Sequence, residues 1–437
     1  MSINFLISQR AARVGVIGLG YVGLPLAIDV LRSGYPMTGY DIDGGRIADL
    51  QRGVSYIESV SDSAILAASV DVRASWLNDA SGLADCDIIL VCVPTPLTAQ
   101  KEPDLSYVVR AVDDVAKFVR RDVLVVVEST CYPGATESIV RSRFEAHGFS
   151  LGKNLFLGYS PEREDPGNKT FCTRNIPKIV SGIDQESAQL TAEFYDSICD
   201  QVVPVSDMRT AEAVKIAENV FRSVNIALIN ELKQVFREFG VDIWEVIDAA
   251  STKPFGYMPF FPGPGVGGHC IPIDPHYLLW AARERAVPAR IVRIAAELND
   301  AMPVWVVKRV AETIGCSEPE NFSSKRILLV GIAYKRNVAD CRESPALSIY
   351  KLLLAAGANV TCLDPHVRDI KGLQVAVGSN DFEVMTHLNG ESYDAAIIVT
   401  DHDSIDFNML LDLECPIFDT RNAMKYRGIS HPNVVTA

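Results

Sequence analysis

A glycine-rich loop near the middle of the chain holds the residues best suited to covalent chemistry. The loop reads Pro262-Gly-Pro-Gly-Val-Gly-Gly-His-Cys270-Ile-Pro-Ile-Asp274-Pro275. Its glycines let the backbone approach a ligand closely, and its prolines stiffen the loop. A cysteine in such a loop, with the carboxylate of Asp274 four residues later, is typical of a positioned nucleophile. The competing interpretation is a buried structural cysteine, which is the commoner fate of a lone cysteine.

A second motif, Gly18-Leu-Gly-Tyr-Val-Gly23, is typical of a dinucleotide-binding turn. An apolar strand precedes it, a helical pattern follows it, and a second strand ends at Asp41, 18 residues after Gly23. An acid at that distance would bond the adenosine ribose and repel the extra phosphate of NADP, so NAD is the predicted cofactor. Arg46 could accept that phosphate or stack on the adenine. The predicted cofactor contacts here are Gly18, Gly20, Tyr21, Val22, Gly23, Asp41 and Arg46.

Three further apolar strands end in polar residues. The strands at 88–93, 123–127 and 155–157 precede Thr95, Thr130 and Glu162, respectively. Ligands of parallel sheets bind beyond the carboxyl ends of the strands, so we expect these side chains near the cofactor and substrate. For the two threonines, local turn chemistry is the alternative.

A long helical pattern runs from Asp207 to Phe239 and is closed by Gly240. Within it, Lys215 and Asn219 are four residues apart, so they share one face of the helix. The ordinary interpretation of such a lysine is a solvated flank. A lysine and an asparagine stacked one turn apart and facing a catalytic loop could instead stabilise an oxyanion or hold a water.

The remaining patterns predict the domain organisation. Helices are expected at 242–250 and at 291–314, the latter interrupted by Pro303, so the centre of the chain is predicted to be all-helical and to carry the subunit interface. Beyond residue 323, strands at 327–331, 361–364, 395–400 and 416–419 and a helix at 345–355 form an alternating pattern without the glycine motif. We therefore predict an α/β fold with two Rossmann-like, doubly wound domains joined by a central all-helical dimerisation domain. The predicted limits are 1–205, 206–315 and 316–437.

The composition is that of a globular protein with several domains. The chain has 437 residues, 48% of them hydrophobic and 22% charged. No apolar run reaches the roughly 18 residues of a membrane span, and the N-terminus lacks a signal-peptide pattern, so we expect a cytoplasmic protein without membrane insertion. The net charge of −14 argues against nucleic-acid binding. Ten scattered cysteines without a Cys-x-x-Cys pair predict free thiols and no metal site.

Motifs in order along nearly the whole chain resemble the UDP-glucose/GDP-mannose dehydrogenase family of nucleotide-sugar 6-dehydrogenases. They are Gly18-Leu-Gly-Tyr-Val-Gly-Leu-Pro25, Val93-Pro-Thr-Pro96, Glu128-Ser-Thr130, Ser160-Pro-Glu162-Arg, Ala213-Val-Lys215-Ile-Ala-Glu-Asn219, Gly265-Val-Gly-Gly-His-Cys270 with Asp274, and Gly331-Ile-Ala-Tyr-Lys335 with Arg342-Glu-Ser-Pro345. Within the family, Thr252–Gly265, the His269-Cys270 pair and Val54-Ser-Tyr-Ile-Glu58 resemble bacterial UDP-N-acetylglucosamine 6-dehydrogenases of surface-polysaccharide synthesis. Enzymes acting on UDP-N-acetylmannosamine, UDP-N-acetylgalactosamine or UDP-glucose remain alternatives.

The resemblance implies an NAD domain, a helical dimer domain and a UDP-binding domain, and hence a homodimer or higher homo-oligomer. It implies a four-electron oxidation of the sugar C6 alcohol to a carboxylate by two NAD in turn, through a thiohemiacetal and a thioester on Cys270. The implied catalytic residues are Cys270, Lys215, Asn219, Asp274, Thr130 and Glu162. Thr95 and Thr130 would also contact NAD, and the implied UDP-sugar contacts are Glu162, Lys215, Asn219, Gly267, Lys335, Arg342 and Arg421.

Two competing functions leave parts of the sequence unexplained. A two-electron dehydrogenase of the 3-hydroxyacyl or 6-phosphogluconate type would account for neither Cys270 nor a third domain. A catalytically silent regulator that binds NAD or a nucleotide sugar would be favoured by loss of Lys215, Cys270 or Asp274, and all three are present. His269 is a further candidate base, although its place next to Cys270 makes pairing awkward. Cys131 is interpreted as incidental packing.

Overall fold

The chain forms two compact units, each described by itself. The computed structural model describes residues 1–57, 59–120, 122–165, 168, 170–316, 321–367, 370, 373–374, 377–378, 382–388 and 390–436. The first unit comprises Met1–Glu218 and His276–Val287, and the second comprises Asn219–Pro275 and Pro288–Ala437. Glu58, the last residue of the Val54 motif, lies outside the described residues.

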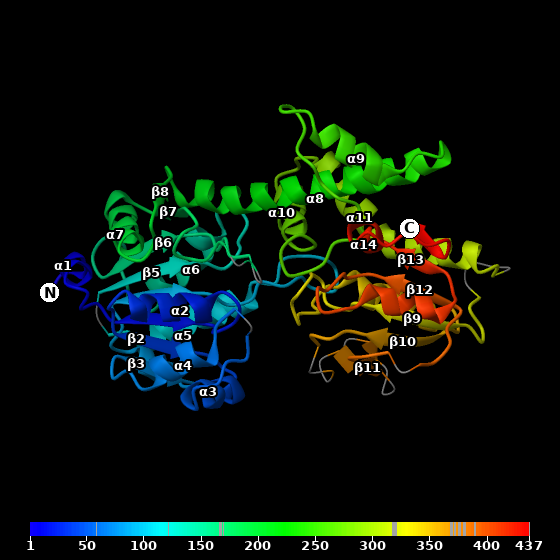
Figure 1. Cartoon of the computed structure of the whole chain (residues 1–437). Coiled ribbons are helices and arrows are strands. Elements are labelled where there is room, and N and C mark those ends of the chain that lie inside the picture. The colour runs from blue at the N-terminus through cyan, green and yellow to red at the C-terminus, as the bar shows by residue number, and fades with distance from the viewer. Residues whose placement is uncertain are drawn as a thin grey trace. The chain divides into compact units, whose positions relative to one another are not determined.

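The first unit is built on an eight-stranded sheet in the order β3-β2-β1-β4-β5-β6-β7-β8. Figure 1 labels β2, β3, β5, β6, β7 and β8 of this sheet. Its strands are β1 Val14–Ile17, β2 Met37–Tyr40, β3 Ala74–Leu77, β4 Ile88–Val91, β5 Val123–Val127, β6 Leu155–Tyr159, β7 Lys178–Gly182 and β8 Val202–Pro204. Strands β3 to β6 are parallel and follow the nucleotide-binding order 3-2-1-4-5-6. Strand β7 then pairs antiparallel with β6 and parallel with β8, so these two strands extend the sheet.

Helices cover both faces of this sheet because its central strands, β4 and β5, are apolar and buried at every position. In β5, Leu124 and Val126 pack into the core cluster that contains Leu24 of α2, whereas Val125 packs into the opposite cluster with Val112 of α5. A strand buried on both faces is typical of a doubly wound sheet. The helices are α1 Ile3–Ser8, α2 Gly23–Arg32, α3 Gly44–Gln51, α4 Asp62–Ser69, α5 Ser106–Phe118, α6 Ala135–Ala146 and α7 Gln185–Asp196, with a 3-10 turn at Ala80–Leu83.

The second unit contains a six-stranded parallel sheet in the order β11-β10-β9-β12-β13-β14. Its strands are β9 Arg326–Val330, β10 Asn359–Leu363, β11 Val384–Met385, β12 Ala395–Ile398, β13 Ile417–Asp419 and β14 Val434–Thr436. In chain order this is again 3-2-1-4-5-6, so the prediction of a second Rossmann-like domain is confirmed. Its two faces bury separate clusters, one with α11 and α12 and one with the 407–413 turn and α14.

The predicted helical centre is also confirmed. Its helices are α8 Met208–Glu238, α9 Ile243–Ser251, α10 Asp274–Arg283 and α11 Arg290–Thr313, followed by α12 Pro345–Ala355 and α14 Ala423–Tyr426. Helix α8 ends just before Gly240, which has a φ of 72°, and the Asp242 side chain caps α9. Helix α10 is not predicted from the sequence, because the prolines and glycines before it indicate a loop. No helix in the described ranges is both long and apolar enough to cross a membrane.

The prediction that Pro303 interrupts its helix is wrong, because α11 is continuous through this residue. Proline removes one helical hydrogen bond, at a cost of about 3 kcal/mol. Here Met302, Pro303 and Val306 are buried, and Gly265 packs so closely that a Cβ there would lie 3.3 Å from the Asn299 carbonyl oxygen. Burial of this face against neighbouring elements therefore outweighs the lost bond.

Candidate active site

The glycine turn after β1 has the shape that a dinucleotide requires. Gly18 has a φ of 84°, and a Cβ there would lie 2.7 Å from the Cys92 carbonyl oxygen. A Cβ on Gly23 would clash with the Gly18 carbonyl. At Gly20, by contrast, an added Cβ would meet no atom within 4 Å. The outer glycines therefore serve the turn and its packing, whereas Gly20 leaves an open cradle beside the first turn of α2.

This cradle fits NAD. No side chain caps the N-terminus of α2, so the helix end is available to a pyrophosphate. Asp41 is buried at the end of β2, where its Oδ2 accepts the Leu19 N–H at 2.8 Å. Arg46 lies 3.6 Å from the same carboxylate oxygen. The Arg46 guanidinium also lies over the ring of Tyr56, which belongs to the Val54-Ser-Tyr-Ile-Glu58 motif.

The polar residues after β4, β5 and β6 lie at one edge of the sheet, as predicted, because the three strands are parallel. Ser129 donates from Oγ to the Val93 carbonyl at 2.7 Å, which ties the loop of Thr130 to the loop of Thr95. The Glu162 N–H donates to the Glu128 carbonyl at 3.4 Å, which ties in the third loop. One side-chain and one backbone hydrogen bond thus hold the three predicted site loops together.

Lys215 is held by Glu162 within the first unit. Its Nζ donates to the Glu162 carbonyl at 2.6 Å and lies 2.9 Å from the Glu162 carboxylate. The residue is only 4% exposed, so the interpretation of Lys215 as a solvated flank is wrong. The contact fixes the ammonium in a protein environment where a single charge acts strongly.

In the second unit, the cysteine loop meets Asn219. The Cys270 carbonyl accepts the Asp274 N–H at 2.8 Å, a turn that starts α10. The Asp274 carboxylate is buried in the first turn of that helix, where the helix dipole favours negative charge, and it accepts a hydrogen bond from the Asn219 amide. Cys270 itself is partly exposed, whereas seven of the ten cysteines are buried. This exposure contradicts the interpretation of Cys270 as a buried structural cysteine.

The same loop packs against the segment that carries two predicted substrate contacts. A Cβ on Gly267 would lie 2.8 Å from the Tyr334 Cβ, and the Gly268 N–H donates to the Arg342 carbonyl at 3.0 Å. Lys335, next to Tyr334, is partly exposed. The glycines at 267 and 268 therefore allow the cysteine loop to lie directly on the Lys335–Arg342 segment.

The two predicted substrate arginines of this unit, Arg342 and Arg421, have different hydrogen-bond partners. Arg342 donates from Nε to Asp340 at 3.0 Å, and one of its terminal nitrogens lies 3.4 Å from Nδ1 of His269. Because arginine can only donate, the Nδ1 lone pair of His269 accepts this bond, which weakens the case for that atom as a base. Arg421 donates from Nε to the Val399 carbonyl at 2.8 Å, and burial lowers the pKa of its guanidinium.

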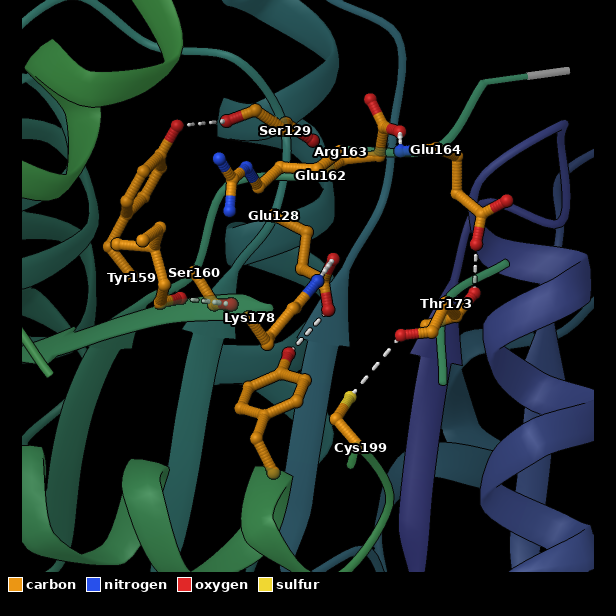
Figure 2. A network of polar contacts seen from close by, with 12 residues as sticks. Glu128, Ser129, Tyr159, Ser160, Glu162, Arg163, Glu164, Thr173, Lys178 and Cys199 are labelled. Atoms are coloured by element: carbon orange, nitrogen blue, oxygen red, sulfur yellow. Dashed lines mark hydrogen bonds and ion pairs between the residues drawn. The ribbon is translucent and has the colours of Figure 1, made fainter. Parts of the chain in front are cut away.

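A buried charge cluster in the first unit was not predicted (Figure 2). Lys178, the first residue of β7, places Nζ 2.6 Å from Oε2 of Glu128, and both residues are buried. The hydroxyl of Tyr195, on α7, donates to Oε1 of the same carboxylate. We call these three residues the Lys178 triad. The available signal was a lysine opening an otherwise apolar segment, Lys178-Ile-Val. Among the described residues, no group of three or more His, Cys, Asp or Glu side chains could hold a metal.

Family models match three parts of the chain. The NAD binding domain of the UDP-glucose/GDP-mannose dehydrogenase family matches residues 12–199, its central domain matches 209–301, and its UDP binding domain matches 328–426. The predicted limits at 205/206 and 315/316 stay a proposal.

Individual relatives match most of the chain. The UDP-N-acetyl-D-glucosamine 6-dehydrogenase of Pseudomonas aeruginosa is 37% identical over 363 residues, covering 82% of this chain and 84% of the relative. A UDP-N-acetyl-D-mannosamine dehydrogenase of Methanococcus maripaludis is 34% identical over 433 residues, covering 95% and 93%. The solved structure of a UDP-D-ManNAc dehydrogenase from Pyrococcus horikoshii has 32% identity and a TM-score of 0.82, covering 96% of each chain.

Proposed function

This chain belongs to the UDP-glucose/GDP-mannose dehydrogenase family, and we propose that it oxidises the C6 hydroxyl of UDP-N-acetylglucosamine to a carboxylate. Its activity is that of an NAD-dependent nucleotide-sugar 6-dehydrogenase. One observation carries the residue assignments. The partly exposed Cys270 begins the turn to a buried Asp274–Asn219 pair, on a loop that packs against the Lys335–Arg342 segment.

In this proposal Cys270 makes the second oxidation possible. When bound, NAD supplies a hydride acceptor for each of the two oxidations. The first oxidation gives an aldehyde, whose carbon does not readily release another hydride until a nucleophile makes it tetrahedral. The Cys270 thiolate adds to that carbon, and loss of the second hydride leaves a thioester. Water then hydrolyses the thioester, which releases the carboxylate and regenerates the thiol.

The polar and charged residues around this chemistry have distinct proposed tasks. Lys215 and Asn219 stabilise the oxyanion of the tetrahedral intermediate, since an ammonium and an amide N–H both donate to developing negative charge. Asp274 accepts a proton from the attacking water. Thr130 and Glu162 position water, and Glu162 also fixes Lys215 through the contact of 2.9 Å.

The UDP moiety is proposed to bind the second unit through Gly267, Lys335, Arg342 and Arg421. Arginine suits the paired oxygens of phosphate, and glycine lets the backbone approach the sugar. The choice of UDP-N-acetylglucosamine is supported by the residue motifs and by the 37% identity to the P. aeruginosa relative. UDP-N-acetylmannosamine is the second candidate, because relatives named for it match up to 97% of the chain.

The setting of the reaction is proposed along with the substrate. We place the enzyme in the cytoplasm, where it would supply a nucleotide-linked uronic acid for surface polysaccharides such as the O-antigen of lipopolysaccharide. We propose a homodimer or a higher homo-oligomer, joined through the helical centre.

The deciding experiment measures NADH released per sugar consumed, with NAD in excess. UDP-N-acetylglucosamine, UDP-N-acetylmannosamine, UDP-N-acetylgalactosamine and UDP-glucose are compared at equal concentration, and kcat/KM is determined for each. We expect two NADH per UDP-N-acetylglucosamine and the highest kcat/KM for this sugar. Two NADH with a higher kcat/KM for another sugar would move the substrate to that sugar. One NADH would mean that oxidation stops at the aldehyde, which would contradict the proposed role of Cys270.

A further inference from the structure

The Lys178 triad connects the extension of the first sheet to the proposed catalytic edge. Its carboxylate belongs to Glu128, which directly precedes Ser129 and Thr130 at the end of β5. The Glu128 carbonyl accepts the Glu162 N–H at 3.4 Å, and Glu162 in turn holds Lys215. Contacts therefore run without a break from β7 to α8.

Lys178 and Glu128 form a charged pair in the interior, where two apolar side chains would stabilise the fold at least as well. Lys178 and Glu128 are 5% and 2% exposed, so both lose most of their hydration. Replacing such a buried pair with apolar residues of similar volume is often neutral or stabilising. The stability of the fold alone therefore does not explain why these two positions are charged. A better explanation is that the pair fixes the position of the Glu128 carboxylate.

Both oxygens of Glu128 are held from elements outside the six-stranded nucleotide-binding order. Lys178 on β7 holds one oxygen and Tyr195 on α7 holds the other. Burial alone would lower the pKa of Lys178, but the Glu128 carboxylate outweighs this effect and raises it, so the lysine stays charged. Burial and the same carboxylate raise the pKa of Tyr195, which keeps its hydroxyl a donor.

We propose that Lys178 is a positioning residue for the oxidation, acting through the Glu128 carboxylate on the loops that carry Thr130 and Glu162. This inference rests on the proposed function, since it assigns those loops to the reaction. Strands β7 and β8 with helix α7 then set the geometry of the catalytic edge and do more than extend the sheet.

The test compares Lys178→Met with Lys153→Met, the same substitution at an exposed lysine of the same unit. Hydrogen exchange measured peptide by peptide should become at least about tenfold faster at 127–131 and 160–165 in Lys178→Met, while α2 exchanges as before. In turnover of the UDP-sugar, kcat should fall about 10- to 100-fold and KM should change less than about threefold. Lys178→Arg keeps the positive charge. In this variant the decrease in log kcat should be at most half of the decrease in Lys178→Met.

Two results would overturn the proposal. One is exchange and kcat in Lys178→Met that match Lys153→Met. The other is faster exchange throughout the unit, α2 included, with kcat falling only in proportion to the folded fraction. If Lys178→Met does not fold, Tyr195→Phe replaces it, and a several-fold loss of kcat at an unchanged melting temperature is expected, whereas unchanged kcat would overturn the proposal. Hydrogen exchange needs no substrate, so a wild-type enzyme that oxidises none of the four UDP-sugars would reject the proposed substrate while the exchange data still decide the role of Lys178.

Discussion

Cys270 is required for the second of the two proposed oxidations but not for the first. An alcohol can transfer its first hydride without a covalent bond to the protein, whereas the second transfer needs the tetrahedral thiohemiacetal. Replacing the thiol by a hydroxyl, a poor nucleophile here, should therefore block the second step far more than the first. In Cys270→Ser we expect NADH per sugar to fall from two toward one, with steady-state turnover lower by on the order of 10³ or more.

Cys316→Ser is the matched control, because Cys316 is also partly exposed and lies in the second unit. It should keep two NADH per sugar at nearly the wild-type rate. An aldehyde trap added to Cys270→Ser should collect the sugar aldehyde. Two NADH per sugar from Cys270→Ser would show that the second oxidation proceeds without the thiol.

At the scale of elements, helix α8 buries a lysine that reports on the packing of the second unit. Lys233 is 5% exposed, and its Nζ lies 4.8 Å from the Trp305 ring centroid. Burial, with a smaller contribution from the nearby Arg421, lowers the pKa of Lys233 to about 7. Below that pH the lysine is charged in both the folded and unfolded states, and the folded state bears the full cost of the buried charge. Between about pH 7 and the unfolded value of 10.5 the folded lysine is neutral, so stability rises with pH.

Lys233→Met should therefore stabilise the protein most at or below neutral pH. We expect a gain on the order of 2 to 4 kcal/mol near pH 6.5, which shrinks as the pH approaches 10. Melting temperatures of the variant and the wild type at pH 6.5 and 9.5 measure the effect. Lys351→Met, at an exposed position of α12, should give no such dependence. An equal gain at both pH values would show that the lysine is not buried as a charge.

The elements also show what the sequence could and could not predict. The glycine motif predicted the β1–α2 turn because Gly18 and Gly23 have no room for a side chain. The apolar strands predicted both doubly wound sheets, since strands buried on two faces are nearly continuous runs of apolar residues. The break predicted at Pro303 was wrong because packing against neighbouring elements, and not the local sequence, keeps α11 continuous. The Lys178 triad joins residues up to 67 positions apart along the chain, and only the folded sheet brings them together.

At the scale of the whole molecule, exposed apolar residues on the part of α8 that lies in the second unit support the proposed oligomer. Phe221, Leu228 and Val235 follow one another at intervals of seven residues, so they share one face of the helix. Their exposed fractions are 49%, 48% and 45%, and that of Phe239, one turn further, is 76%. Monomeric proteins rarely leave such a row of large apolar side chains exposed to water.

Leu228→Glu combined with Val235→Glu should separate the subunits, because a charge in the centre of an apolar interface loses its hydration without gaining a partner. Light scattering after gel filtration should give the wild type at least twice the 47.8 kDa of one chain, and the double variant a single chain at micromolar concentration. Arg237→Glu is the control, since this exposed residue lies about half a turn away from Val235 on the same helix, and it should keep the wild-type mass. A wild type of 47.8 kDa would contradict the oligomer, and an unchanged mass in the double variant would place the interface on another face.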